Sequence, residues 1–130
     1  MNPSSHVFPV LLALAASAAG AEEGDALGVG QAAWYEHCTV CHGKDGTGGG
    51  PFVPLLREAP PDLTVLARDN GGEFPAAAVR AAVDGRDMPL AHGTSDMPLW
   101  GKLLREAGEC EERTRSRVAD VVAWLRTLQR

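Results

Sequence analysis

Two cysteines and a histidine impose the tightest constraint on this chain, in the run Cys38-Thr39-Val40-Cys41-His42. C-x-x-C-H is the attachment signature of c-type haem. Two thiols about one helical turn apart can each add to one of two neighbouring vinyl groups on the porphyrin edge. The next residue, His42, can then bind the iron from the proximal side. The motif therefore predicts one covalently attached haem c, held by Cys38 and Cys41 and ligated by His42.

The same cysteines have two other chemical uses that the sequence supports less well. A thioredoxin-like redox pair follows a strand in a βαβ unit, whereas the preceding "GQAAWYEH" has a helical pattern. A zinc site needs four ligands. Cys38 and Cys41 would have to recruit Cys110, His37 or His92, because the chain has no second paired motif. Both uses stay open as alternatives, and the haem interpretation is favoured.

The start of the chain is typical of a secretory signal. Residues 7–21, "VFPVLLALAASAAGA", are apolar and small, and no Asp, Glu, Lys or Arg precedes Glu22. A membrane span needs roughly 20 apolar residues, which is more than this run supplies. Its small residues suit cleavage after Ala21, although "MNPSSH" lacks the usual Lys or Arg. We predict a signal peptide at 1–21, a domain at 22–130 and export to the periplasm; an uncleaved anchor or a buried N-terminal helix are the alternatives.

Charge and size limit what the mature domain can do. The formal charge of −5 belongs entirely to it, since residues 1–21 carry no charged side chain. Nucleic acid demands basic clusters, so we expect no nucleic-acid partner. A domain of this length buries only about 65% of its unfolded surface, so a covalent cross-link would help it. We expect no stable membrane insertion once the signal is removed.

Hydrophobic spacing predicts helices, and no segment alternates convincingly as a strand. One apolar face near the C-terminus recurs every three or four residues, which indicates a buried helix face; it consists of Val118, Val121, Val122, Leu125 and Leu128. No proline interrupts residues 27–41, and a third helix is predicted at 76–84, between Pro75 and Gly85. A weaker helix is predicted at 62–70. The expected class is all-α, with three to five helices around the haem.

These segments together resemble the small, single-haem class I cytochromes c of bacteria, over roughly residues 28–129. The resemblance rests on "GQAAWYEHCTVCHGKDGTGGGP", "PPDLTVLARDNGGEFPAAAVRAAVDGR", "HGTSDMPLWG" and "RVADVVAWLRTL". It implies a cytochrome c-like fold in which the first and last helices cross. Gly30 with Trp34, and Val121 with Trp124, match the small and aromatic positions of that crossing. Both tryptophans are therefore expected in the core.

The second axial position of the iron decides what such a haem does. Met88 and Met97 stand in the repeated stretch "DMPLAHGTSDMPLW", and each precedes a proline that stiffens the backbone. The family resemblance favours Met97 as ligand, because "SDMPLWG" matches the usual ligand segment. Met88, His92 or an open position are the alternatives, and Met88 is otherwise a core residue. Trp100 and Arg86 are candidates for contact with a haem propionate.

These observations predict a periplasmic one-electron carrier with His42 and Met97 on the iron. It is not expected to be an enzyme, since the cofactor supplies the redox chemistry. Its partners would be redox proteins that donate and accept electrons. One alternative is an electron-accepting cytochrome subunit bound to a periplasmic dehydrogenase or oxidase. A gas-binding sensor of the cytochrome c prime kind is less suitable, because that family carries its haem motif near the C-terminus.

Overall fold

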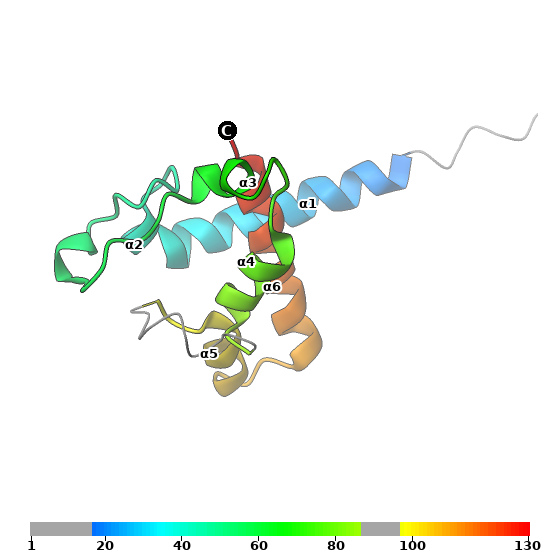
Figure 1. The fold of residues 1–130 in the computed structure, drawn as a ribbon. Helices are drawn as coiled ribbons and strands as arrows, with labels where there is room; N and C mark the ends of the chain where they lie inside the picture. Colours follow the sequence, from blue (N-terminus) through cyan, green and yellow to red (C-terminus); the bar gives the residue numbers. More distant parts are fainter. Residues whose placement is uncertain (1–16, 87–96) are drawn as a thin grey trace, which may run out of the picture.

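The computed structural model describes residues 17–86 and 97–130 and has an all-α architecture (Figure 1). No strand occurs in these two ranges, as the sequence pattern predicted. The elements, in chain order, are α1 (Ser17–Ala33), the π-helical turn η1 (Trp34–Cys38), α2 (Thr39–His42), the short 3-10 turns η2 (Val53–Leu55) and η3 (Leu63–Val65), α3 (Leu66–Asp69), α4 (Ala76–Asp84), α5 (Trp100–Glu106) and α6 (Glu111–Thr127).

The first and last helices cross, and they do so at the predicted glycine. Figure 1 shows α6 passing across α1. A Cβ added to Gly30 would lie 2.0 Å from the carbonyl oxygen of Asp120 and 3.1 Å from Cβ of Trp124. Only a residue without a side chain allows this approach of the two backbones. The expected contact between a small residue and an aromatic one is confirmed.

The hydrophobic core lies between α6 and the elements that pack against it. Four of the five predicted apolar positions of α6 are buried, namely Val118, Val121, Val122 and Leu125. Trp34, Phe74 and Val83 complete the buried cluster, and Trp124 is partly buried against it. The indole N–H of Trp34 donates to the carbonyl of Lys44, 3.2 Å away. Trp34 therefore occupies the core, as predicted, and also fixes the segment that follows His42.

The middle helices follow the predicted boundaries closely. Helix α4 covers 76–84, with Pro75 before its first turn and Gly85 after its last. Gly85 has φ +78°, a left-handed conformation that favours glycine at this position. The weaker helix expected at 62–70 forms as η3 followed by α3.

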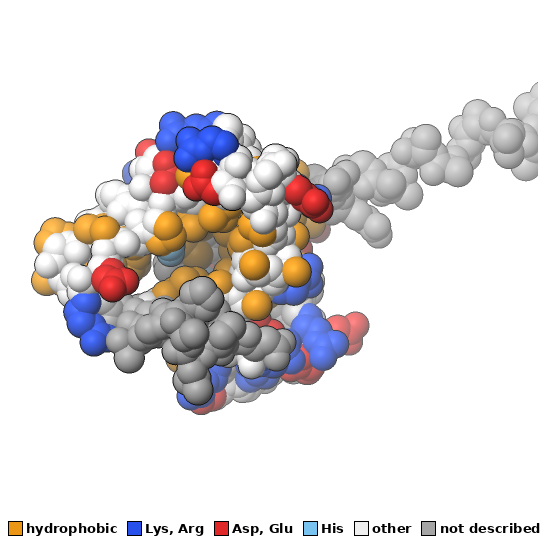
Figure 2. All heavy atoms as spheres, in the orientation of Figure 1, with side chains coloured by type: hydrophobic (Ala, Val, Ile, Leu, Met, Phe, Trp, Pro, Cys, Tyr) orange, Lys and Arg blue, Asp and Glu red, His pale blue; other side chains and the backbone are white. Residues whose placement is uncertain are grey.

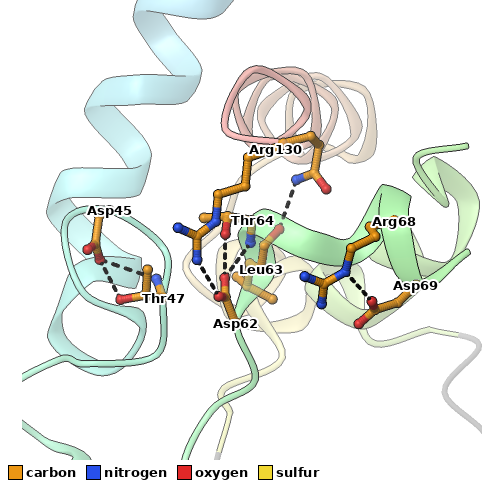
Figure 3. A network of polar contacts seen from close by, with 9 residues as sticks. Asp45, Thr47, Asp62, Leu63, Thr64, Arg68, Asp69 and Arg130 are labelled. Carbon is orange, nitrogen blue, oxygen red and sulfur yellow. Dashed lines mark hydrogen bonds and ion pairs between the residues drawn. The ribbon is translucent and has the colours of Figure 1, made fainter. Parts of the chain in front are cut away.

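The C-terminal end is tied to the middle of the chain by polar contacts (Figure 3). The carboxylate of Asp62 accepts hydrogen bonds from the backbone N–H and hydroxyl of Thr64, at 2.9 and 2.6 Å. Its other oxygen accepts from the Arg130 guanidinium at 2.9 Å. The Gln129 amide donates to the carbonyl of Leu63 at 2.8 Å. These contacts hold the end of α6 against η3.

Two features at the ends of the predicted elements differ from the sequence analysis or extend it. The sequence analysis predicted no helix between 76–84 and the C-terminal one, but residues 100–106 form α5. At the other end, α1 begins at Ser17 and runs through Ala21, so the boundary between signal and domain stays a prediction. Within the described ranges, no helix has both the length and the apolar character that crossing a membrane requires.

Candidate haem site

The two cysteines and the histidine sit on consecutive short helical turns at the end of α1. Cys38 closes the π-helical turn η1, and Cys41 and His42 close α2. Single π turns inside helices often occur at functional sites because they change the direction of the following residues. Both thiols are free and half-buried. The predicted attachment residues are therefore presented one helical turn apart, from one continuous stretch of helix.

The glycine-rich segment after His42 folds back onto this turn. Gly43 has φ +78°, and the N–H of Gly48 donates to the carbonyl of His42 at 2.8 Å. The N–H of Gly50 donates to the carbonyl of Cys41 at 3.0 Å. A Cβ on Gly50 would lie 2.4 Å from the carbonyl oxygen of Val40. The glycines therefore let the chain leave a crowded turn.

His42 is buried in an apolar environment. It is 9% exposed, and its ring centroid lies 5.9 Å from that of Trp34. Burial lowers the pKa of His42 below its usual value, which keeps the imidazole neutral. Its Nδ1 is buried and has no hydrogen-bond partner among the described residues. A neutral, desolvated imidazole is the form that ligates a metal.

The environment of Cys38 opposes thiolate chemistry. Burial, followed by the nearby Cys41, raises the pKa of the Cys38 thiol to about 12. A redox-active pair needs a thiolate, which this environment disfavours. Moreover, no group of three or more His, Cys, Asp or Glu side chains in the described ranges is arranged to hold a metal ion. A thioether carries no charge, so burial costs it far less.

An apolar hollow opens beside Cys38. It encloses about 410 Å³, including the part open to solvent, and its apolar lining includes Val83, Leu104, Val118 and Val121. His42 is not part of this lining, so the hollow extends along the Cys38 side of the turn. Figure 2 shows hydrophobic side chains around a recess with a histidine at its back. The attachment turn thus borders a hollow that is lined mainly by apolar side chains.

Comparison with protein families gives a match over almost the whole domain. The model for the family described as "Cytochrome c" matches residues 29–129. This chain belongs to the cytochrome c family. It is a class I member, as the resemblance of its segments implied, and it is a haem-binding electron carrier. No curated protein and no solved structure gave a match.

The residues of this cytochrome fit haem c. Two half-buried thiols and a buried, neutral imidazole with an unpartnered ring nitrogen supply the donor set. The apolar hollow beside Cys38 is suited to a flat hydrophobic group lying against the turn. Thioether bonds and an axial histidine are the interactions that hold this cofactor.

Met97 lies in the same apolar cluster as the attachment turn. It is half-buried, and both Met97 and Cys38 pack against the cluster that contains Trp34. The structure therefore brings the predicted sixth ligand and the first attachment residue to one core. Met88 and His92, the alternatives, lie outside the described residues.

The other residues named from the sequence have specific neighbours. The ring of Trp100 packs against that of His37, with centroids 4.8 Å apart. Arg86, considered for a propionate contact, forms ion pairs with Asp84 and Glu111. Cys110 is an exposed free thiol.

Sequence reasoning missed two features near the site. The first is Asp84, an acidic residue that is buried at the end of α4 and paired with Arg105 at 2.8 Å. No sequence signal marked it, because its partner is 21 positions away. The second is the exposed apolar run that contains Phe52 and Leu55. The sequence "PFVPLL" could have indicated this exposed patch, since the run is apolar but too short to form a core helix.

Proposed function

We propose that this cytochrome is an exported carrier that moves one electron at a time through a single haem c. Cys38 and Cys41 hold the cofactor covalently, and His42 and Met97 ligate its iron. The observation that carries the proposal is the attachment turn, with both thiols and the buried imidazole on adjoining helical turns. Removal of residues 1–21 would release the domain into the periplasm.

The bound haem supplies the one-electron chemistry of its iron. The chain contributes fixed ligands and exclusion of water. His42 stays neutral because burial lowers its pKa, so no proton has to leave before it binds iron. The thioether of Met97 would be the second protein ligand of the iron and would raise the reduction potential relative to two nitrogen ligands. No residue in this scheme acts as an acid or base.

Met97 is preferred over Met88 on two grounds. Its segment matches the family's ligand segment, and its side chain lies against the cluster that also contacts Cys38. A proline follows each methionine, at positions 89 and 98, so this restriction of the backbone does not separate the two. The first two features support Met97 as the ligand that closes the site.

Paired methionine variants test this assignment. The ferric wild type, produced with haem maturation machinery, should be low-spin and show the weak sulfur-to-iron band at the red end of its visible spectrum. Met97→Ala should lose this band and become high-spin or bind an added ligand. Met88→Ala, the matched control from the identical "DMPL" copy, should keep it. A Met97→Ala protein that keeps the band would contradict the assignment.

One observation favours the second candidate, an electron-accepting subunit that stays bound to a periplasmic dehydrogenase or oxidase. Phe52 is 50% exposed and Leu55 is 78% exposed, on the segment that returns to the attachment turn. The N–H of Phe52 donates to the carbonyl of Val40 at 2.9 Å, which places this apolar patch next to the cysteines. Exposed apolar side chains that are grouped together often mark a protein interface.

Copurification separates the two candidates. A tagged chain recovered from its own periplasm should carry no second protein through gel filtration if it is a free carrier, because carrier contacts are small and transient. A stoichiometric partner that is lost in the double variant Phe52→Ser/Leu55→Ser would instead establish the subunit function. The single variant Leu103→Ser, at another exposed apolar side chain, controls for a general effect of surface polarity.

A further inference from the structure

A buried acidic residue closes α4 just before the segment that leads to Met97. Asp84 is 9% exposed. One carboxylate oxygen accepts a hydrogen bond from Arg105 at 2.8 Å, and the other accepts from Arg86 at 2.6 Å. Arg86 also pairs with Glu111, at the start of α6. The group therefore links the end of α4, the helix α5 and the first turn of α6.

This position is unfavourable for an isolated carboxylate. The C-terminus of a helix carries partial negative charge, which repels an anion. Burial works to raise the pKa of Asp84, but the hydrogen bonds from Arg105 and Arg86 outweigh it and hold the pKa below its usual value. The carboxylate thus stays charged because both arginines neutralise it, and each arginine is correspondingly held in place.

The chain is closely packed around this carboxylate, with a glycine on each side of the contact. A Cβ on Gly101 would lie 1.8 Å from a carboxylate oxygen of Asp84. A Cβ on Gly85 would lie 2.7 Å from Cβ of Leu99. The chain therefore leaves α4 and enters α5 at one crowded point. Met97 stands two residues before Leu99, directly beside that point in the sequence.

We propose that Asp84, through Arg105 and Arg86, is the positioning residue for Met97. The carboxylate ties together the two ends of the segment that runs from α4 to α5, so that Met97 starts from a fixed backbone. This inference rests on the proposed function, since it requires Met97 to ligate the iron. Without the tie, α5 is held less firmly against the end of α4, and Met97, three residues before α5, starts from a less fixed backbone.

A loosened segment has a measurable consequence at the iron. An external ligand binds only to molecules in which Met97 has left the sixth position. The apparent affinity for such a ligand rises in proportion to the fraction of these molecules. Imidazole is a suitable probe, because it binds ferric haem and shifts the visible spectrum.

The test compares two aspartate variants of the ferric holoprotein. Asp84→Asn removes the charge that faces Arg105 and Arg86. Asp62→Asn is the matched control, since it removes an equivalent charge that faces Arg130 in the contacts of Figure 3. For both we would measure the sulfur-to-iron band, imidazole affinity and the urea midpoint of unfolding.

We expect Asp84→Asn to bind imidazole about tenfold more tightly than the wild type and to lose much of the band, a tenfold change being about 1.4 kcal/mol. Asp62→Asn should lower the urea midpoint and leave both spectroscopic measurements unchanged. Arg105→Gln should behave like Asp84→Asn, and Arg105→Lys should recover part of the band. The Arg105 variants decide the matter if Asp84→Asn does not accumulate.

The positioning role would be overturned if Asp84→Asn and Arg105→Gln, like Asp62→Asn, kept the band intensity and the imidazole affinity of the wild type. The proposed function would then remain intact. A wild type without the band would overturn the Met97 assignment itself, and the positioning role with it. The two failures are therefore distinguishable.

Discussion

The crossing of α1 and α6 gives a sharp stability prediction, because two glycines of the same helix face different surroundings. Gly28→Ala adds a methyl group that meets nothing within 4 Å, so it should gain the intrinsic helix preference of alanine, about 1 kcal/mol. Gly30→Ala has the same intrinsic gain. However, its methyl carbon would lie 2.0 Å from the Asp120 carbonyl oxygen, which is far inside contact distance.

The two helices must therefore move apart by about 1.5 Å to restore an ordinary contact. Overpacking of this kind costs about 1–3 kcal/mol, and here the obstacle is backbone that cannot rotate away. The separation also weakens the packing of Trp34 and Val121 in the core. We take the upper end of this range, about 3 kcal/mol, because the obstacle is backbone, and subtract the helix preference of about 1 kcal/mol; Gly30→Ala should then lower the free energy of unfolding by about 2 kcal/mol. The two alanine variants should then differ by about 3 kcal/mol.

Urea unfolding of the ferric holoproteins, followed by far-UV circular dichroism, measures this difference. If the free energy of unfolding falls with urea at the same slope in each variant and only the midpoint shifts, stability alone has changed. A loss of 2 kcal/mol corresponds to a fall in Tm of about 10 °C for a domain of this size. A Gly30→Ala protein as stable as Gly28→Ala would refute the close crossing.

Three further changes test the site and its support. Cys38→Ser and Cys41→Ser should each keep haem in denaturing mass spectrometry through one thioether, and the double variant should lose it. Gly50→Ala, whose Cβ would lie 2.4 Å from the Val40 carbonyl oxygen, should lower the free energy of unfolding by about 1–3 kcal/mol, whereas Gly49→Ala, with nothing nearer than 3.9 Å, should not. Hydrogen bonds from Thr64, and then Arg130, hold the pKa of Asp62 below its usual value. The charged Asp62 carboxylate therefore stabilises the folded protein above about pH 4, and this stabilisation is lost as the pH falls through the pKa of Asp62 in the folded state. The urea midpoints of unfolding of the wild type and Asp62→Asn should then converge in acid.

The sequence predicted those parts of the fold that depend on local signals. Pro75 and Gly85 marked the ends of α4 correctly, because each favours one end of a helix for its own backbone reason. The apolar spacing of α6 identified its buried face, since that spacing must match the helical repeat. The attachment motif is equally local, with all three functional groups inside five residues.

Features that depend on distant parts of the chain were not predictable in this way. Helix α5 is short and has Gly101 at its second position, so its helical tendency is weak and its packing against α4 decides the outcome. The burial of Asp84 depends on Arg105, which only the folded chain brings near. Met88 and Met97 share the same four-letter surroundings, so local sequence cannot separate them, and the family resemblance was needed.

A visible spectrum of the holoprotein, oxidised and reduced, tests the central claim most directly. The account predicts haem that stays attached after denaturation, a low-spin spectrum in both states, and the weak sulfur-to-iron band in the ferric state. Covalent haem with a high-spin spectrum would contradict ligation by Met97 and point to an open sixth position. A protein that matures without covalent haem would contradict the account as a whole.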